Sequence, residues 1–152
     1  MKKVLLVTIM FVLCLTLTGC KEKNVEGSLE EIMTKVYSTL KQDETPMMLT
    51  NIQITEENVE AYLGTTDIKF KEALASESAT GSIAHSVVLI RVDEKTNVEQ
   101  VKEKIENSVN PRKWICVEAE EVEVESKGNL ILLVMSNEKT VEKITEQFEK
   151  LK

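Results

Sequence analysis

The chain has 152 residues, of which 26 are acidic and 19 basic, giving a formal net charge of −7 at pH 7. This acidic balance argues against nucleic acid as a partner and against broad adhesion to anionic lipid headgroups, because both carry negative charge. The length is sufficient for one domain with a hydrophobic core.

The N-terminus has the pattern of a bacterial lipoprotein signal peptide, which is removed from the mature protein. Two lysines precede an apolar run, residues 4–17. As a helix this run would reach only about 21 Å, short of the ~30 Å hydrocarbon core. It ends in Leu17-Thr18-Gly19-Cys20, where small residues precede a cysteine as lipoprotein signal peptidase requires. Cleavage would leave acyl chains on Cys20, each buried methylene contributing ~0.8 kcal/mol. An ordinary secretory signal with a chance cysteine is the alternative.

We therefore divide the chain into a signal peptide (1–19), a lipidated cysteine with a short polar tether (20–27) and a single α+β domain (28–152). Removing the signal leaves 17 basic residues against 26 acidic ones, a net charge of −9. The lipid anchor, rather than surface charge, would then hold the protein to the bilayer. The predicted location is the cell membrane, on its extracytoplasmic face.

The cysteines indicate that the domain folds without an internal disulfide. Cys14 leaves with the signal and Cys20 is acylated, which leaves Cys116 without a partner. Cys116 lies between Ile115 and Val117 in an apolar run typical of a strand. We expect it to be a buried structural thiol rather than a reactive one.

The first part of the domain predicts two helices and then a strand. Ser28 with Glu31 three residues later forms a capping box, and apolar residues follow at helical spacing. Residues 47–49 are interpreted as a short apolar link. A second, shorter helix is predicted over 55–64, ending at a glycine. Strand character begins over 67–75, where apolar residues share one face.

The second part alternates strands and helices. A loop of small residues, 76–82, precedes a strand over 83–92 whose centre is apolar on both faces, as in a central strand. A third helix opens at Asn97 with Gln100 and stops at Asn110-Pro111, because proline disfavours a helical residue before it. The remaining predicted elements are a strand from Trp114 continuing irregularly to Glu125, a turn at 126–129, a central strand over 130–135 and a helix from about Glu138.

Two segments repeat one order of features: an apolar strand, Glu-Lys-Thr, and a helix with valine near its start. They are VVLIRVDEKTNVEQVKEKIENS and LILLVMSNEKTVEKITEQFEKL. Each follows another strand, which gives a strand-strand-helix unit twice. Two such units predict an α+β fold with a four-stranded antiparallel sheet and both helices on one face, preceded by one or two N-terminal helices. This arrangement is a permuted ferredoxin-like one.

One catalytic hypothesis is a hydrolase or acyl-transfer enzyme in which His85 activates Ser76, Ser82 or Ser86. His85 and Ser86 cannot pair directly, because adjacent strand residues point to opposite faces. The sequence also lacks a Gly-x-Ser-x-Gly elbow. A histidine hydrogen-bonded within the sheet or at its exposed edge is the simpler interpretation, and we predict no catalytic residue.

No metal or other cofactor is predicted. One histidine and one unlipidated cysteine are too few for a zinc site without several carboxylates. The glutamates between 118 and 125 lack the Asp/Asn/Gly spacing of a calcium loop, and their alternation with valine is typical of a solvated strand face. A Walker loop, a dinucleotide fingerprint and Cys-x-x-Cys are absent from the sequence.

A partner-binding surface is predicted from residues of two segments, Ser76, Glu77, Arg112, Lys113 and Trp114. Guanidinium and ammonium donors beside an aromatic plane can hold a carboxylate, a phosphate or a sugar ring. The alternative is that the tryptophan caps the core while the two basic residues offset the C-terminal dipole of the third helix.

The strings EALASES…SIAHSVVLIRV and NPRKWICVEAEEV…GNLILL resemble an uncharacterised lipoprotein family of low-GC Gram-positive bacteria, catalogued as domain of unknown function four-three-five-eight. The resemblance covers roughly residues 28–150. Relatives tend to carry proline and methionine after the Ser-Glu pair, whereas this chain has Ser78-Ala79-Thr80-Gly81. A partner contacting that loop would be held differently here. The family has no established activity, so the resemblance implies no catalytic residues.

These observations predict a membrane-anchored, extracytoplasmic lipoprotein that acts as a non-enzymatic binding or accessory module of the cell envelope. Its expected partners are the bilayer, through Cys20, and an envelope protein or polymer whose identity the residues do not specify. The hydrolase or acyl-transfer enzyme is the first alternative. An accessory of an envelope O-acylation system is the second, and no residue pattern supports it.

Overall fold

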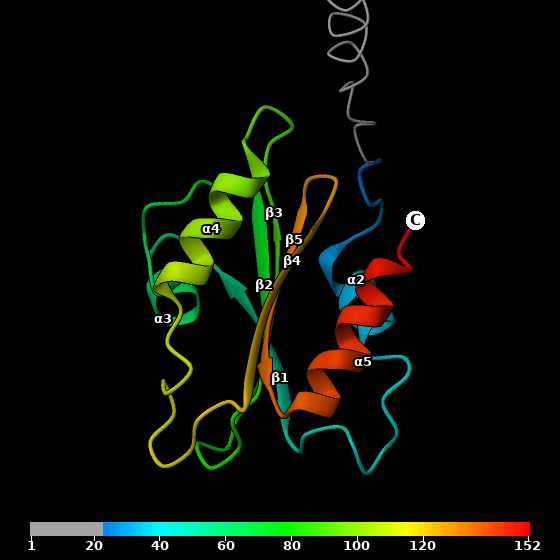
Figure 1. The fold of residues 1–152 in the computed structure, drawn as a ribbon, viewed down its shortest axis with the longest axis vertical. Coiled ribbons are helices and arrows are strands. Elements are labelled where there is room, and N and C mark those ends of the chain that lie inside the picture. The colour runs from blue at the N-terminus through cyan, green and yellow to red at the C-terminus, as the bar shows by residue number, and fades with distance from the viewer. Residues whose placement is uncertain (1–22) are drawn as a thin grey trace, which may run out of the picture.

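The structure, a computed structural model, describes residues 23–152, so the predicted signal peptide and Cys20 lie outside the described residues. A five-stranded antiparallel sheet lies between two pairs of helices (Figure 1). The strand order across the sheet is β1-β2-β3-β5-β4. The strands are β1 (Leu49–Ile54), β2 (Glu72–Ser78), β3 (Ser86–Arg91), β4 (Glu121–Lys127) and β5 (Leu130–Ser136).

The helices begin at polar caps that the sequence makes visible. The helices are α2 (Leu29–Val36), α3 (Val59–Leu63), α4 (Val98–Ser108) and α5 (Glu138–Glu149). The predicted capping box at Ser28 and Glu31 is present at the start of α2. Asn97 and Asn137 accept hydrogen bonds from backbone N–H groups at the starts of α4 and α5. Within residues 23–152, no helix has the length and apolar character needed to cross a bilayer.

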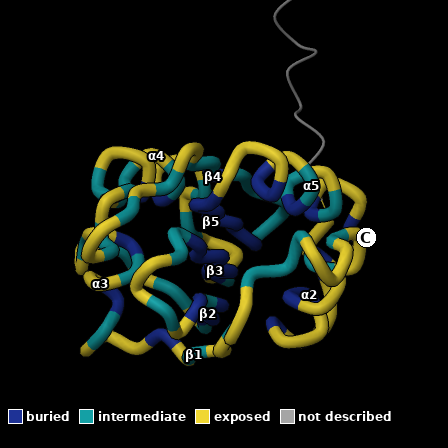
Figure 2. The backbone as a smooth tube through the Cα atoms, turned by 90° about the horizontal axis from the view of Figure 1, so that it is seen from below, coloured by how far each residue is buried: buried dark blue, intermediate teal, exposed yellow. Residues whose placement is uncertain are grey.

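The helices cover both faces of the sheet, with α2 and α5 on one side and α3 and α4 on the other (Figure 2). Successive residues of β3 alternate between the two cores: Leu89 packs on the α2/α5 side, and Val88 and Ile90 pack on the α3/α4 side. Every residue of β5 is buried. The prediction that β3 and β5 are central strands is therefore confirmed.

The predicted α+β class is correct, but the sheet has five strands rather than four and its helices are not on one face. Both strand-strand-helix units are present in order, as β2-β3-α4 and β4-β5-α5. Their helices lie on opposite faces. If the two units were related by symmetry, the two-fold axis between the antiparallel strands β3 and β5 would be normal to the sheet. Such an axis would place α4 and α5 on the same face, so the two units are not related in this way. A ferredoxin-like arrangement is thus wrong, because central strands apolar on both faces need a helix layer on each side.

Several local predictions were also wrong. The loop predicted over 76–82 begins only after Ser78, the strand predicted over 83–92 begins at Ser86, and the helix predicted over 55–64 begins at Val59. Residues 47–49 do not form a link alone, because Leu49 begins the edge strand β1. The strand predicted over 67–75 begins only at Glu72. The strand predicted from Trp114 is a loop, and β4 begins at Glu121. The place beside β5 is taken by residues 121–127, which leaves no strand for the Trp114 segment to pair with.

The polar tether belongs partly to the fold. Val25 is buried in the core on the α2/α5 side. The backbone of Lys23 and Asn24 packs closely on Gly128, where a Cβ would lie 2.7 Å from the carbonyl oxygen of Lys23. The packed domain therefore begins before residue 28, next to the turn between β4 and β5.

Candidate functional site

The two predicted partner-binding segments lie side by side at one end of the sheet (Figure 1). A Cβ on Gly81 would lie 3.8 Å from Cδ1 of Ile115, which places the β2–β3 loop against the segment between α4 and β4. The start of β1 joins them, because the Ala79 N–H donates to the carbonyl of Met48 at 3.0 Å. We call residues 47–48, 79–85 and 109–120 together the loop end.

The loop end is opposite the point where the tether reaches the domain. In the β3–β5 pairing, Ser86 is opposite Met135 whereas Arg91 is opposite Leu130. The loop before β3 and the turn before β5 therefore lie at opposite ends of the sheet. Since the tether packs on the turn before β5, the loop end is the far end of the molecule.

Lys113 is the centre of a polar cluster at the loop end. Its ammonium group forms an ion pair with the Glu77 carboxylate and a 3.3 Å hydrogen bond to Ser86 Oγ. Lys113 Nζ also lies 5.0 Å from the ring centre of Tyr62 and 5.3 Å from that of Trp114, within the range of cation–π attraction. The side chains of Lys113 and Glu77 are only 15% and 18% exposed.

Burial and pairing act in opposite directions on Lys113. Desolvation lowers the pKa of its ammonium group, whereas the charge and hydrogen bond of Glu77 raise it. Burial beside Glu77 raises the pKa of the Tyr62 hydroxyl. The ion pair therefore holds the loop in place, since either partner alone would be an uncompensated charge in a largely buried position.

Local backbone chemistry explains how these residues meet. Gly64 ends α3 with a left-handed backbone (φ 71°), and a Cβ there would lie 1.9 Å from the Ser108 carbonyl oxygen. Only glycine allows the end of α3 to approach the end of α4 so closely. This contact brings Tyr62 over the following loop. The Ala119 N–H donates to the Pro111 carbonyl at 2.9 Å and closes that loop around Lys113.

Of the five predicted binding residues, Glu77, Lys113 and Trp114 come together. Arg112 does not join them: its side chain is 77% exposed and pairs with Glu118 at 3.2 Å. Ser76 precedes Glu77 in β2 and so faces the other side of the sheet, where it is buried. The contacts of Tyr62 and Ser86 with Lys113 were not predicted from the sequence. These residues are 51 and 27 positions away from Lys113 in the chain, so no local sequence pattern connects them.

His85 is part of a second polar cluster, on the α2/α5 side. Its Nδ1 lies 2.9 Å from Ser136 Oγ and its Nε2 lies 2.7 Å from the Tyr37 hydroxyl. Burial lowers the pKa of His85 to about 4, so the ring is neutral at pH 7, with one nitrogen donating and the other accepting. Burial also raises the pKa of the Tyr37 hydroxyl. His85 is thus hydrogen-bonded as predicted, but it lies just before β3 rather than in a strand and is buried rather than at an exposed edge.

This geometry does not favour Ser/His catalysis. Ser86 points to the opposite face from His85, as expected, and Ser82 is exposed on the loop. The serine that His85 contacts is Ser136, which is buried, as is His85 itself. A nucleophile needs access to its substrate, and neither side chain of this pair is accessible.

Exposed apolar side chains gather at the loop end. The large hydrophobic residues with high exposure are Met47 (69%), Met48 (67%) and Ile115 (91%). We call these three residues the distal patch. Cys116 beside it is exposed, so the prediction of a buried thiol was wrong. A shallow depression lined by Arg112 and by residues 114–118 adjoins the patch.

The acidic run near β4 is only partly paired with basic groups, and burial together with neighbouring Glu125 and Glu121 raises the pKa of Glu123. Glu118 pairs with Arg112 and Glu125 pairs with Lys102 at 3.3 Å. Across residues 23–152, no group of three histidine, cysteine, aspartate or glutamate side chains is placed to hold a metal ion. The residues at the loop end thus offer contact chemistry, namely apolar surface, one exposed guanidinium and an aromatic ring.

Searches against protein-family models, curated proteins and solved structures found no match. The resemblance to the Gram-positive lipoprotein family therefore stays a prediction.

Proposed function

We propose that this protein is a lipid-anchored, extracytoplasmic lipoprotein whose domain is a non-enzymatic binding module, with the loop end as its contact surface. One observation carries the proposal: the three residues of the distal patch gather at the end of the sheet farthest from the tether. Large apolar side chains this exposed, carried on loops that converge at one end of a domain, favour an interaction site there. Methionine suits such a site because its flexible side chain adapts to a partner.

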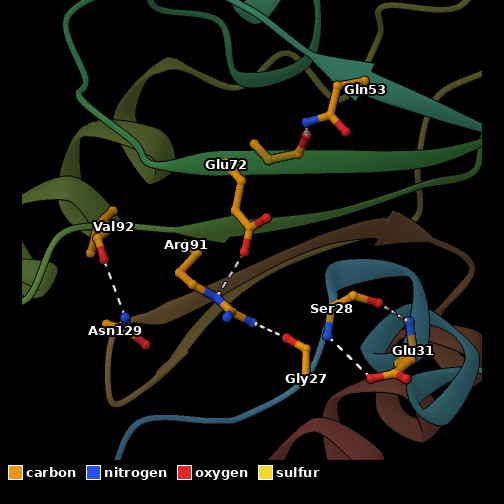
Figure 3. A network of polar contacts seen from close by, with 9 residues as sticks. Gly27, Ser28, Glu31, Gln53, Glu72, Arg91, Val92 and Asn129 are labelled. Carbon is orange, nitrogen blue, oxygen red and sulfur yellow. Dashed lines mark hydrogen bonds and ion pairs between the residues drawn. The ribbon is translucent and has the colours of Figure 1, made fainter.

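The way in which the tether is attached to the domain supports a loop end that points away from the membrane. Arg91 Nη2 donates to the Gly27 carbonyl at 2.8 Å, and Arg91 Nε pairs with Glu72 at 3.2 Å (Figure 3). With Val25 buried, the chain is fixed to the domain from Asn24 onward. Only residues 21 and 22 then separate an acylated Cys20 from Lys23, and the three steps of chain between them reach about 11 Å at most. The turn between β4 and β5 would face the membrane, and the loop end would point away from it.

The two polar clusters support a preformed contact surface. Glu77 and Ser86 hold the α4–β4 loop through Lys113 on one side of the sheet. On the other side, His85 ties the end of β5 to the end of α2 through Ser136 and Tyr37. Ordered loops lose little conformational entropy on binding, which favours recognition by a modest surface.

Photo-crosslinking in cells tests the proposed surface. A photoreactive amino acid at Ile115 or at Thr80 should capture the same envelope component, because both positions lie at the loop end. The matched control is Lys95, an exposed residue of the β3–α4 loop at the opposite end of the sheet. The proposal fails if neither Ile115 nor Thr80 captures a defined neighbour, or if Lys95 captures it equally well.

The anchor has a separate test. Cys20→Ala should release the protein from the membrane fraction, since a thiol at this position is needed for acylation. Retention of the Cys20→Ala variant in that fraction, at the level of the unchanged protein, would contradict lipid anchoring. The result does not depend on the contact surface.

A further inference from the structure

The two outer strands of the sheet differ in how they are protected against pairing with another strand. The outer strand β4 carries charges at alternate positions, Glu121, Glu123, Glu125 and Lys127. The other outer strand, β1, has the sequence LTNIQI, without a charge, a proline or a break in its register with β2. Charged residues, proline and bulges are the usual devices that block an exposed edge. β4 has such a device and β1 has none.

The outward backbone groups of β1 follow from its pairing with β2. The Ala79 N–H donates to Met48 O, so residues 48 and 79 form a hydrogen-bonded pair. In an antiparallel ladder such pairs alternate, and the N–H and C=O groups of Leu49, Asn51 and Gln53 therefore point away from β2. The Asn58 amide donates to the Gln53 carbonyl at 3.1 Å. The outward groups of Leu49 and Asn51 form no hydrogen bond within the described residues.

Within residues 23–152, β1 is an outer strand of the sheet and is paired on one side only, with β2. β1 lies at the outer margin of the sheet when the molecule is viewed along the strands (Figure 2). The side chains of Thr50, Asn51 and Gln53 are exposed, whereas Leu49 and Ile52 are half-buried. The strand also begins directly after Met47 and Met48 of the distal patch. An added strand would therefore extend the contact surface without a gap.

If residues 1–19 are removed as proposed, residues 20–22 are unsuited to supply the added strand. The described chain starts at Lys23, beside the turn between β4 and β5. β1 is three strand spacings from β5, about 14 Å, and a strand of three residues reaches at most about 11 Å.

A second anchored copy does not fit β1 in the antiparallel direction. The two-fold axis of an antiparallel β1–β1 pair is normal to the sheet and would place the two Lys23 ends at opposite ends of a ten-stranded sheet. Tethers of about 11 Å could not both reach one bilayer across strands about 20 Å long.

We propose that β1 binds an extended segment of another envelope protein, about six residues long and uncharged, which pairs with Leu49 and Asn51 as a sixth strand. The proposal rests on the anchored, outward-facing domain proposed above. Backbone hydrogen bonds would supply much of the affinity, as in other strand-addition complexes. Low charge in the segment is required because β1 offers no group that would pair with a charge.

The test places a photoreactive amino acid at Thr50 of the full-length protein in cells and compares three variants at Asn51. Asn51→Pro removes the outward N–H but no hydrogen bond to β2. Asn51→Lys keeps every backbone group and adds an edge charge like those of β4. Asn51→Thr keeps the N–H and is the matched control.

We expect capture of one contiguous segment of another protein from Thr50, reduced at least ten-fold by Asn51→Pro and Asn51→Lys and changed less than two-fold by Asn51→Thr. If thermal melting shows that the proline variant is unfolded, the lysine variant decides. Capture of nothing, capture of a second copy, or capture insensitive to both substitutions would overturn the inference. If a partner is still captured from Ile115 in those cases, the proposed function stands. If no partner is captured from either Thr50 or Ile115, both the proposed function and the inference about β1 are contradicted.

Discussion

Acid should destabilise this protein through His85, which is buried and neutral in the folded protein. The ring is buried between Ser136 and Tyr37, and burial lowers its pKa from 6.5 to about 4. Between these values the unfolded chain binds a proton that the folded chain does not bind. The free energy of unfolding therefore rises with pH from about 4 to 6.5 and is lost as the pH falls through that range.

The magnitude follows from the two pKa values. One pKa unit corresponds to about 1.4 kcal/mol, so the full difference is worth roughly 3 kcal/mol. Between pH 7 and pH 5 the expected loss of unfolding free energy is about 2 kcal/mol. The loss is smaller than the full difference because pH 5 is still above the pKa of about 4 that His85 has in the folded protein. Salt-bridged Glu44, whose pKa is about 2, contributes to acid sensitivity only below about pH 4.5.

Urea unfolding at pH 7, 6 and 5 measures this loss, and His85→Gln is the control. Glutamine can bond to both neighbours of His85 but does not titrate, so its unfolding free energy should fall about 2 kcal/mol less between pH 7 and pH 5. Glu123, whose pKa burial raises, titrates in both proteins and cancels in the comparison. An equal loss in both proteins would refute the assignment of the acid sensitivity to His85.

Three further predictions concern the loop end. Lys113→Met should lower the free energy of unfolding, measured in urea, by roughly 3–5 kcal/mol, because it leaves Glu77 largely buried without its partner. Arg112→Met breaks an exposed pair and should cost under about 1 kcal/mol. Equal effects of the two substitutions would contradict the structure. Cys116 should react with a maleimide in the folded protein within minutes, and reaction only after adding urea would show that it is buried. A serine-directed fluorophosphonate should not label the folded protein, because His85 is buried, and labelling that His85→Ala abolishes would revive the hydrolase hypothesis.

The fold was predictable where one element carries its own pattern. The central strands β3 and β5 show continuous apolar runs, and the capping residues of α2 and α4 stand at the expected spacing. β1 was missed because its apolar residues, Leu49, Ile52 and Ile54, do not alternate regularly. The run from Trp114 to Val117 misled for the opposite reason, since an apolar run forms a strand only where a neighbouring strand is free to pair with it.

The helix layers and the site depended on contacts that no local pattern encodes. The repeat in sequence indicated two equivalent units, but the side that a helix takes is decided by which face of the sheet is still uncovered. α2 and α5 share one face, so α4 covers the other. Likewise Lys113 and Glu77 are 36 residues apart and meet only because two loops converge at the same end of the sheet.

The adjacent pair His85 and Ser86 has a consequence that neither residue would have alone. Because neighbouring strand residues face opposite sides, one hydrogen-bonds in the α2/α5 layer and the other in the α3/α4 layer. The start of β3 is thus held from both faces at the point where the apolar core ends and the loop end begins. A serine beside a histidine, which as a sequence motif suggested a nucleophile, instead fixes the loops that carry the distal patch. Rigid support of exposed apolar groups is what a binding surface requires, because an ordered patch binds without the entropic cost of ordering its loops.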